Sequence, residues 1–176
     1  CLAVEVAASG ATKENGPAMI VDLEYDIRVR GVDLIQIALG PHIFVFDTLV
    51  DDMVLRLWEV EGIPTLRSWL ETSRCVKSFQ SCGNDCLILR RDFGIEVRGC
   101  FDTAIADAIA RGVHFSAGRS LGRLCDEWLG GSLMEHKADM QYTPLMFKPR
   151  PLSARLFEYA WQDVADGPAL YRVLSS

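Results

Sequence analysis

Residues 21–26, with the sequence VDLEYD, follow an apolar run and place three acids at the edge of a predicted buried strand. Side chains alternate between the two faces of a strand, so Asp22 and Glu24 point to one face and Leu23 to the other. Two like charges on one face repel each other and cost stability unless a cation lies between them. The alternative is a strand end whose acids are solvated in the following loop, and these six residues leave that choice open.

The pattern of the remaining chain predicts an α/β domain. Alternating apolar residues over 18–25, 33–40 and 42–47 indicate a strand and then a hairpin that turns at Gly40 and Pro41. Further expected elements are helices over 51–62 and 64–72, a strand over 74–79, a helix over 84–94, a strand over 96–103, and helices over 102–112, 120–131 and 153–174. Expected boundary residues are Pro64 and Asn84 at helix starts, Gly94 at a helix end and Gly167-Pro168 as a break in the last helix. Residues 131–152 have a weak pattern and are expected to form a surface loop.

This order of elements indicates a mixed, twisted sheet of about five strands flanked by helices. A chain of 176 residues is long enough for one full hydrophobic core, so we expect residues 1–176 to be a single domain. Because it begins with Cys1 rather than Met, we expect it to be excised from a longer chain. No apolar run reaches about 18 residues, so no membrane span is predicted, and the first residues lack the pattern of a signal peptide.

Charge and cysteine usage narrow the class of protein. The net charge of −6 argues against a protein that coats nucleic acid through bulk charge. Residues 111–155 are nevertheless rich in Lys and Arg and can hold a polyanion locally. None of the six cysteines forms a CxxC pair, so we expect buried free thiols in a reducing compartment, cytoplasm or nucleus, rather than a zinc site or disulfides. The cysteines are Cys1, Cys75, Cys82, Cys86, Cys100 and Cys125.

Two further acids stand where apolar elements begin or end. Asp85 opens the predicted helix over 84–94, and Asp163 lies in the last helix, four residues after Tyr159. Positions i and i+4 share a helix face, so Tyr159 and Asp163 point together. Gathered carboxylates need cations, and oxygen ligands suit Mg²⁺ or Mn²⁺. Two such ions about 4 Å apart are a common device for phosphodiester hydrolysis, although spacing alone leaves open whether the four acids meet.

Three ordered motifs add a resemblance to this pattern. VDLEY, residues 21–25, is similar to the Asp-x-Glu motif of the DEDD family of 3′–5′ exonucleases. Residues 80–95, QSCGNDCLILRRDFGI, followed by GCFDT, resemble the second motif. Residues 150–164, RPLSARLFEYAWQDV, resemble the third motif of the tyrosine-containing, ribonuclease D-like branch. The resemblance covers residues 18–174, and CGND and RGCFDT look closest to the Egalitarian-like group of that branch.

The resemblance implies a ribonuclease H-like fold and a two-metal-ion 3′–5′ exonuclease that acts on single-stranded nucleic acid, RNA rather than DNA. It implies that Asp22 bridges two Mg²⁺ or Mn²⁺ ions. Glu24 and Asp163 would be the other ligands of the first ion, and Asp85 would be a ligand of the second. Tyr159 would orient the attacking water by a hydrogen bond, since a free tyrosine has a pKa near 10.

Further candidate substrate contacts are Leu23, Gln80, Lys137, Lys148 and Arg150. Gln80 stands where many members of the family have His, and the three basic residues have solvated loop charges as their alternative reading. Protein partners would act through the rest of the parent chain. The competing function is an RNA-binding or scaffold module that keeps the exonuclease fold with little or no turnover; the intact set of acids favours the enzyme.

Overall fold

The computed structural model describes residues 3–7, 18–50, 59–60, 63–131, 143 and 145–176. A six-stranded sheet has the strand order β1-β4-β3-β2-β7-β8. Its strands are β1 (Ala3–Ala7), β2 (Met19–Glu24), β3 (Leu34–Leu39), β4 (His42–Asp47), β7 (Lys77–Phe79) and β8 (Cys100–Asp102). Strands β1 to β4 pair in antiparallel fashion, whereas β2, β7 and β8 run parallel. The predicted mixed α/β sheet is therefore confirmed, with β1 as a strand that the sequence pattern did not predict.

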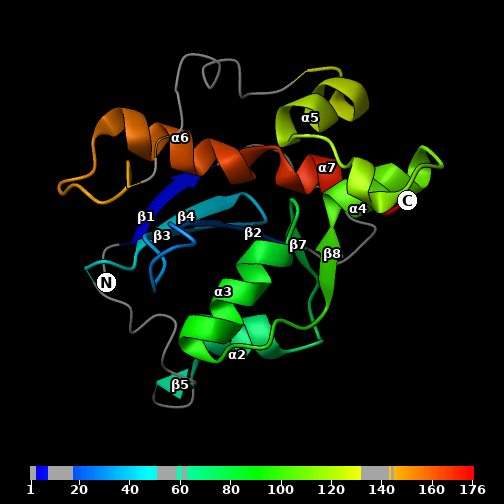
Figure 1. Cartoon of the computed structure of the whole chain (residues 1–176). Helices are drawn as coiled ribbons and strands as arrows, with labels where there is room; N and C mark the ends of the chain where they lie inside the picture. The colour runs from blue at the N-terminus through cyan, green and yellow to red at the C-terminus, as the bar shows by residue number, and fades with distance from the viewer. Residues whose placement is uncertain (1–2, 8–17, 51–58, 61–62, 132–142, 144) are drawn as a thin grey trace.

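The helices form two layers around this sheet (Figure 1). One layer contains α2 (Leu66–Glu71) and α3 (Gly83–Phe93), and the other contains α6 (Ala154–Ala165) and α7 (Gly167–Leu174). The remaining helices are α4 (Thr103–Ala110), the short 3-10 helix η1 (Phe115–Ala117) and α5 (Leu121–Leu129). None of the described helices is both long and apolar enough to cross a membrane.

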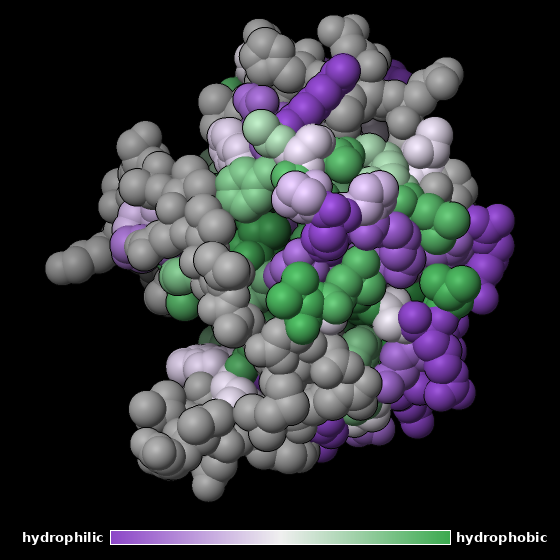
Figure 2. All heavy atoms as spheres, turned by 90° about the vertical axis from the view of Figure 1, so that its left-hand side faces the viewer, coloured by the Kyte–Doolittle hydropathy of each residue, from purple (hydrophilic) through white to green (hydrophobic). Residues whose placement is uncertain are grey.

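Each face of the sheet has its own apolar core because the strands alternate. Met19, Val21 and Leu23 of β2 pack in a core with residues of α2 and α3, such as Leu70 and Leu89. On the opposite face, apolar residues of β2, β3 and β4 pack against α6. Large apolar residues that remain exposed in the described part include Ile27, Val29, Leu49, Val50 and Leu145. On the face seen in Figure 2, apolar side chains gather toward the middle and hydrophilic ones border them on one side.

Glycine is required at two positions, at one for its backbone conformation and at the other for lack of space. Gly40 has a φ of 58° in the two-residue loop between β3 and β4, a conformation that glycine adopts without strain. Gly167 lies against Ile20 of β2, so that any side chain there would collide with Ile20. The predicted helix break at Gly167 and Pro168 is confirmed, and the close contact brings α6 and α7 onto the strand that carries Asp22.

Several predicted boundaries are wrong. Pro64 lies in β6 (Ile63–Pro64), a short strand paired with β5 (Glu59–Val60), and the helix begins only at Leu66 with Thr65 as its N-cap. Residues 51–58 and 61–62 of the predicted helix over 51–62 lie outside the described residues, while 59–60 are strand rather than helix. Pairing with a partner strand overrode the local helical pattern here.

The starts of α3 and the cysteine environments also differ from expectation. Cys82 rather than Asn84 is the N-cap of α3, whereas Gly94 ends the helix in the left-handed conformation as predicted. All five described cysteines are free thiols, but only Cys125 is buried. Cys100 is exposed, because an apolar neighbour in the sequence does not determine which face of a short strand meets solvent.

Candidate active site

Strand β2 places Asp22 and Glu24 on the face of the sheet that α6 covers. Ile20 lies on this same face and packs with Val164 of α6, and the alternation of β2 carries Asp22 and Glu24 along the same side. Glu24 is buried, with 7% of its surface exposed, and Asp22 is half-buried. The alternative interpretation of residues 21–26, a strand end whose acids are solvated in a loop, is therefore wrong.

Helix α6 brings Asp163 to the two strand acids. Carboxylate oxygens of Asp22, Glu24 and Asp163 all lie within 4.8 Å of one another. The contact between Ile20 and Gly167 fixes how closely the helices approach β2. Packing therefore sets the position of Asp163, against the repulsion between the like charges of the acids. The sequence prediction that these three acids converge agrees with this geometry.

Asp85 reaches the same region from the other helix layer. It lies in the first turn of α3 and is buried, with 6% of its surface exposed. Burial, together with repulsion from the charge of Asp22, raises the pKa of the Asp85 carboxyl to about 8, and a hydrogen bond from Tyr25 opposes this shift. At neutral pH and without a cation, the site therefore lowers its crowded negative charge by keeping a proton on Asp85.

This raised pKa predicts how the metal-free protein responds to pH. Between the ordinary pKa of 3.8 and about 8, the folded chain holds a proton on Asp85 that the unfolded chain has lost. The free energy of unfolding should therefore fall as pH rises through this window, and the fall should be smaller in Asp85→Asn. Because a cation must displace this proton, the apparent Mg²⁺ affinity should rise by up to about tenfold per pH unit below about pH 8.

Denaturant unfolding and Mg²⁺ titration between about pH 5.5 and 8.5 would measure both slopes. Asp92→Asn is a suitable comparison, since hydrogen bonding to Arg91 lowers the pKa of Asp92 rather than raising it. Equal pH slopes in the original protein and Asp85→Asn would contradict the assignment of the proton to Asp85.

Tyr159 lies on α6 one turn before Asp163. Its side chain is half-buried, and its ring packs on Phe147 with ring centroids 5.9 Å apart. The i, i+4 relation places the side chains of Tyr159 and Asp163 along one face of α6. Phe147 is 2% exposed, so the tyrosine ring packs against a buried side chain.

Two polar residues that the sequence analysis did not select support the acids. Gln36 is fully buried on β3, directly opposite Asp22 in the strand register, and its side-chain amide donates to Glu24 over 3.4 Å. The Tyr25 hydroxyl donates to Asp85. A lone glutamine within the otherwise apolar stretch LIQIAL was the available signal for Gln36, because buried polar groups need partners.

Gln80 is held rigidly at the edge of the site. Its side-chain amide donates to the backbone carbonyl of Arg119 over 2.8 Å, and its carbonyl oxygen accepts from the Thr103 hydroxyl. Gln80 lines a small cavity together with Asp22 and Asp163, and it also lines a larger neighbouring one. A residue in this place can contact a substrate that passes between the two cavities, and its role stays a prediction.

The other candidate substrate contacts have different surroundings. Lys148 forms an ion pair with Asp33, and Arg150 binds Asp47 with a 2.7 Å contact, so both have a structural role on the loop beside β3 and β4. The Leu23 side chain is buried in the core on the α3 side, which leaves only its backbone for a substrate. Lys137 lies outside the described residues. Substrate binding by these four residues stays a prediction.

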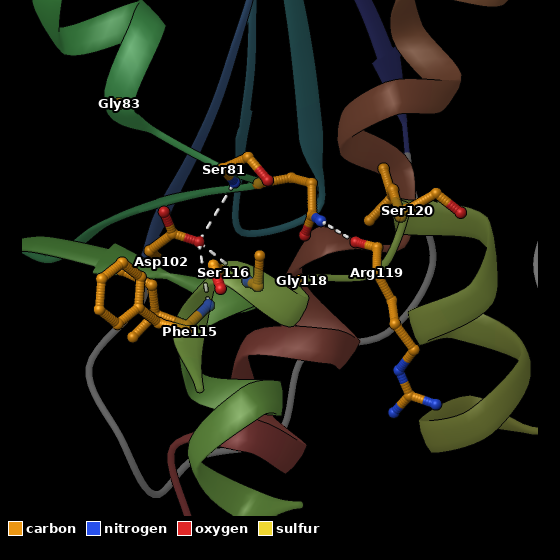
Figure 3. Close-up of a pocket in the computed structure, with 12 residues that line it drawn as sticks. Ser81, Gly83, Asp102, Phe115, Ser116, Gly118, Arg119 and Ser120 are labelled. Atoms are coloured by element: carbon orange, nitrogen blue, oxygen red, sulfur yellow. Dashed lines mark hydrogen bonds between the residues drawn. The ribbon is translucent and has the colours of Figure 1, made fainter. Parts of the chain in front are cut away.

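A cavity of about 570 Å³ adjoins the acids through Gln80 (Figure 3). Its walls come from the starts of α3, α4 and α5 and from η1. Phe115, 62% exposed, lies on one side, and Arg119 turns its guanidinium away from the centre, toward ion pairs with Asp107 and Glu127. Asp102 caps α4 and accepts hydrogen bonds from the backbone amides of Ala104 and Ile105. The cavity thus has a rigid polar wall and an exposed aromatic ring.

The donor set fits divalent cations that prefer oxygen. Three carboxylates lie within 4.8 Å of one another, and burial keeps a fourth, Asp85, protonated. Without a cation, repulsion among these acids destabilises the folded protein. Thiols and imidazoles are absent from this group of acids, which favours Mg²⁺ or Mn²⁺ over softer metals. Acids gathered in this way on a central strand are an arrangement that the class of metal-dependent phosphodiester hydrolases uses.

Comparison with known proteins identifies the family within this class. Residues 14–175 match the model of a 3′–5′ exonuclease family, so the chain belongs to that family. The chain is also 30% identical over 131 residues to ribonuclease D of Xanthomonas oryzae pv. oryzae, a match that covers 74% of this chain. The chain spans 31% of the length of that ribonuclease D. The predicted resemblance to ribonuclease D-like exonucleases is confirmed, while the placement in the Egalitarian-like group stays a prediction.

Solved structures share the fold. Brucella melitensis NrnC has a TM-score of 0.68 at 24% identity, covering 91% of this chain and 72% of the other, and it has been solved with bound Mg²⁺ and with pGG. Trypanosoma brucei RNase D in complex with RNA U12 has a TM-score of 0.67 at 20% identity, covering 89% of this chain and 55% of the other. At this level of identity the two structures establish the ribonuclease H-like fold.

Proposed function

We propose that this chain is a divalent-metal-dependent 3′–5′ exonuclease that removes nucleotides from single-stranded RNA. The observation that carries the proposal is the convergence of Asp22, Glu24 and Asp163, with Tyr159 one helical turn away. Membership of the exonuclease family and the RNA and Mg²⁺ ligands of the structural neighbours support it. Every acid of the family pattern is present in this chain, which favours an enzyme over a scaffold.

The proposed mechanism assigns a role to each side chain. Asp22, Glu24 and Asp163 would hold one divalent ion, and Asp22 and Asp85 would hold a second. Bound ions would activate the attacking water and stabilise the leaving oxygen as Lewis acids. Tyr159 orients that water through its hydroxyl and keeps its own proton, since its ordinary pKa is near 10. Gln36 holds Glu24 in place, and Tyr25 holds Asp85.

An end-labelled substrate assay tests this proposal. Single-stranded RNA and DNA carrying a 5′ label would be incubated with the protein and Mg²⁺, Mn²⁺ or EDTA. We expect a ladder that shortens from the 3′ end, faster on RNA than on DNA and absent in EDTA. Release of the 5′-terminal nucleotide first, or a ladder that persists in EDTA, would contradict the proposal.

The cavity beside Gln80 is the proposed place for the nucleotides that precede the cleaved bond. Gln80 lines both this cavity and the small one beside Asp22 and Asp163, so the larger cavity lies next to the acids. Phe115 presents an exposed ring there, and a base can stack on such a ring without regard to sequence (Figure 3).

Phe115→Ala should therefore weaken binding of single-stranded RNA by about tenfold, since stacking on one aromatic ring contributes about 1–3 kcal/mol. Fluorescence anisotropy in Ca²⁺, which supports binding but little chemistry, would measure the affinity. Ile109→Ala is the matched control, because Ile109 is 71% exposed and does not line the cavity. Equal affinities of Phe115→Ala and Ile109→Ala would place the RNA elsewhere.

A further inference from the structure

Three thiols that are distant in the sequence meet beside the start of α3. The sulfur atoms of Cys82, Cys86 and Cys100 all lie within 4.8 Å of one another. Cys82 and Cys86 are half-buried, and Cys100 is exposed. The other two described cysteines, Cys75 and Cys125, do not belong to this group. The cluster is separate from the carboxylates of the candidate active site, although Cys86 directly follows Asp85 in the chain.

The fold holds these thiols on two neighbouring elements. Cys82 is the N-cap of α3, and Cys86 lies one turn later, with its backbone amide bonded to the carbonyl of Cys82 at 2.9 Å. Cys100 is the first residue of β8 and follows Gly99, whose φ is 66°. A side chain at Gly99 would approach the carbonyl oxygen of Cys75 to 2.9 Å, so the chain reaches Cys100 only with glycine at that position.

Asp102 ties the two elements together through backbone amides, and its carboxylate also contacts the Cys82 thiol. Its carboxylate accepts from the backbone amides of Ser81 at 3.2 Å and Cys82 at 2.9 Å, and also from Ala104 at 2.9 Å (Figure 3). The start of α3 is thereby fixed to the end of β8.

We propose that Cys82, Cys86 and Cys100 bind one Zn²⁺ ion through three thiolates, with the fourth position open to solvent. Zinc–sulfur bonds of about 2.3 Å in a tetrahedral site separate the sulfur atoms by about 3.8 Å, so side-chain rotations of modest size would close the present spacing. Cys82 and Cys86 stand at the N-terminal end of an 11-residue helix, where the helix dipole stabilises thiolates.

Zinc and the carboxylate-bound ions would remain on separate sites. Thiolates select zinc, whereas carboxylates select Mg²⁺ or Mn²⁺. The zinc ion would join the first turn of α3, which carries Asp85, to β8. No zinc site was expected from the sequence because it has no CxxC pair. The third thiol, Cys100, lies 14 positions after Cys86, and only the sheet brings it to the other two.

Cobalt substitution tests the site directly. The full chain, reduced and freed of metal, would be titrated with Co²⁺, and one equivalent should produce the thiolate-to-cobalt charge-transfer band and the visible bands of tetrahedral cobalt. Zn²⁺ should then bleach these bands and raise the Tm of the metal-free protein. Cys82→Ser, Cys86→Ser and Cys100→Ser should each weaken metal binding by about 100-fold or more.

Two variants serve as controls and separate this site from the active site. Cys75→Ser removes a thiol outside the cluster, and Asp22→Asn removes a carboxylate of the active site, so both should develop the thiolate-to-cobalt band like the original protein. Circular dichroism would show that each serine variant is folded. The proposal is overturned if the original protein develops no charge-transfer band, or if Cys86→Ser and Cys100→Ser titrate as the original does. Neither result depends on whether the protein hydrolyses RNA.

Discussion

Replacing Asp22 by Asn is expected to abolish hydrolysis of single-stranded RNA in Mg²⁺ and to leave the metal-free protein at least as stable as before. Carboxylate oxygens of Asp22, Glu24 and Asp163 lie within 4.8 Å of one another, and the charge of Asp22 also acts on Asp85. Losing it removes a ligand that both ions would share, but it also relieves repulsion in a crowded group of acids. The expected sign of the stability change is thus opposite to that of the activity change.

The measurements are a ladder assay on end-labelled RNA and a thermal melt in EDTA. Asp126→Asn is the matched control, because Asp126 is an exposed acid on α5 outside the acidic cluster, and it should retain full activity. A large fall in the Tm of metal-free Asp22→Asn would mean that Asp22 is structural and would remove the basis of the metal assignment.

Replacing Tyr159 by Phe is expected to reduce the rate of hydrolysis by about 100-fold or more, the scale of a positioned catalytic group. The change keeps the ring and its packing on Phe147 and removes only the hydroxyl. RNA affinity in Ca²⁺ should change little. An effect on the rate without an effect on affinity would identify the hydroxyl as acting on the reacting water.

Tyr171→Phe is the control for the loss of a tyrosine hydroxyl. Tyr171 lies on α7, where its ring meets Phe101 edge-on with centroids 5.0 Å apart, and its variant should cut RNA at the original rate. If the domain is a scaffold, the original protein and Tyr159→Phe should bind RNA alike and neither should cut. If both cut equally well, Tyr159 is a packing residue of α6 and the assigned mechanism is wrong.

Much of the site could be predicted because its residues lie on regular elements. The alternation of β2 places Asp22 and Glu24 on one face, and the helical period of α6 aligns Tyr159 with Asp163. These are short-range consequences of backbone geometry. The same reasoning located the hairpin of β3 and β4, the αL end of α3 at Gly94 and the break between α6 and α7.

Some predicted boundaries are wrong, and some contacts between distant residues were not predicted. Pro64 entered a two-stranded pairing instead of starting a helix, and Cys82 displaced Asn84 as the N-cap of α3. The ion pairs of Lys148 with Asp33 and of Arg150 with Asp47 were not predicted either, whereas substrate binding by Lys148 and Arg150 stays a prediction. Asp33 and Asp47 are remote in the chain from Lys148 and Arg150, so no local pattern contains these ion pairs, whereas Pro64 pairs with Glu59 only five positions away.

Residue patterns alone predicted the family, the strands and helices that carry the acids, and which acids share a face of one element. Those properties follow from periodicity and ordered motifs, which depend on neighbouring residues. Only the tertiary structure decided that Asp163 meets Asp22 and Glu24, that Gln36 supports Glu24, and that three thiols meet at the start of α3. Packing across the sheet, such as Gly167 against Ile20, sets these distances, because side chains from separate elements converge only when both faces of the sheet are filled.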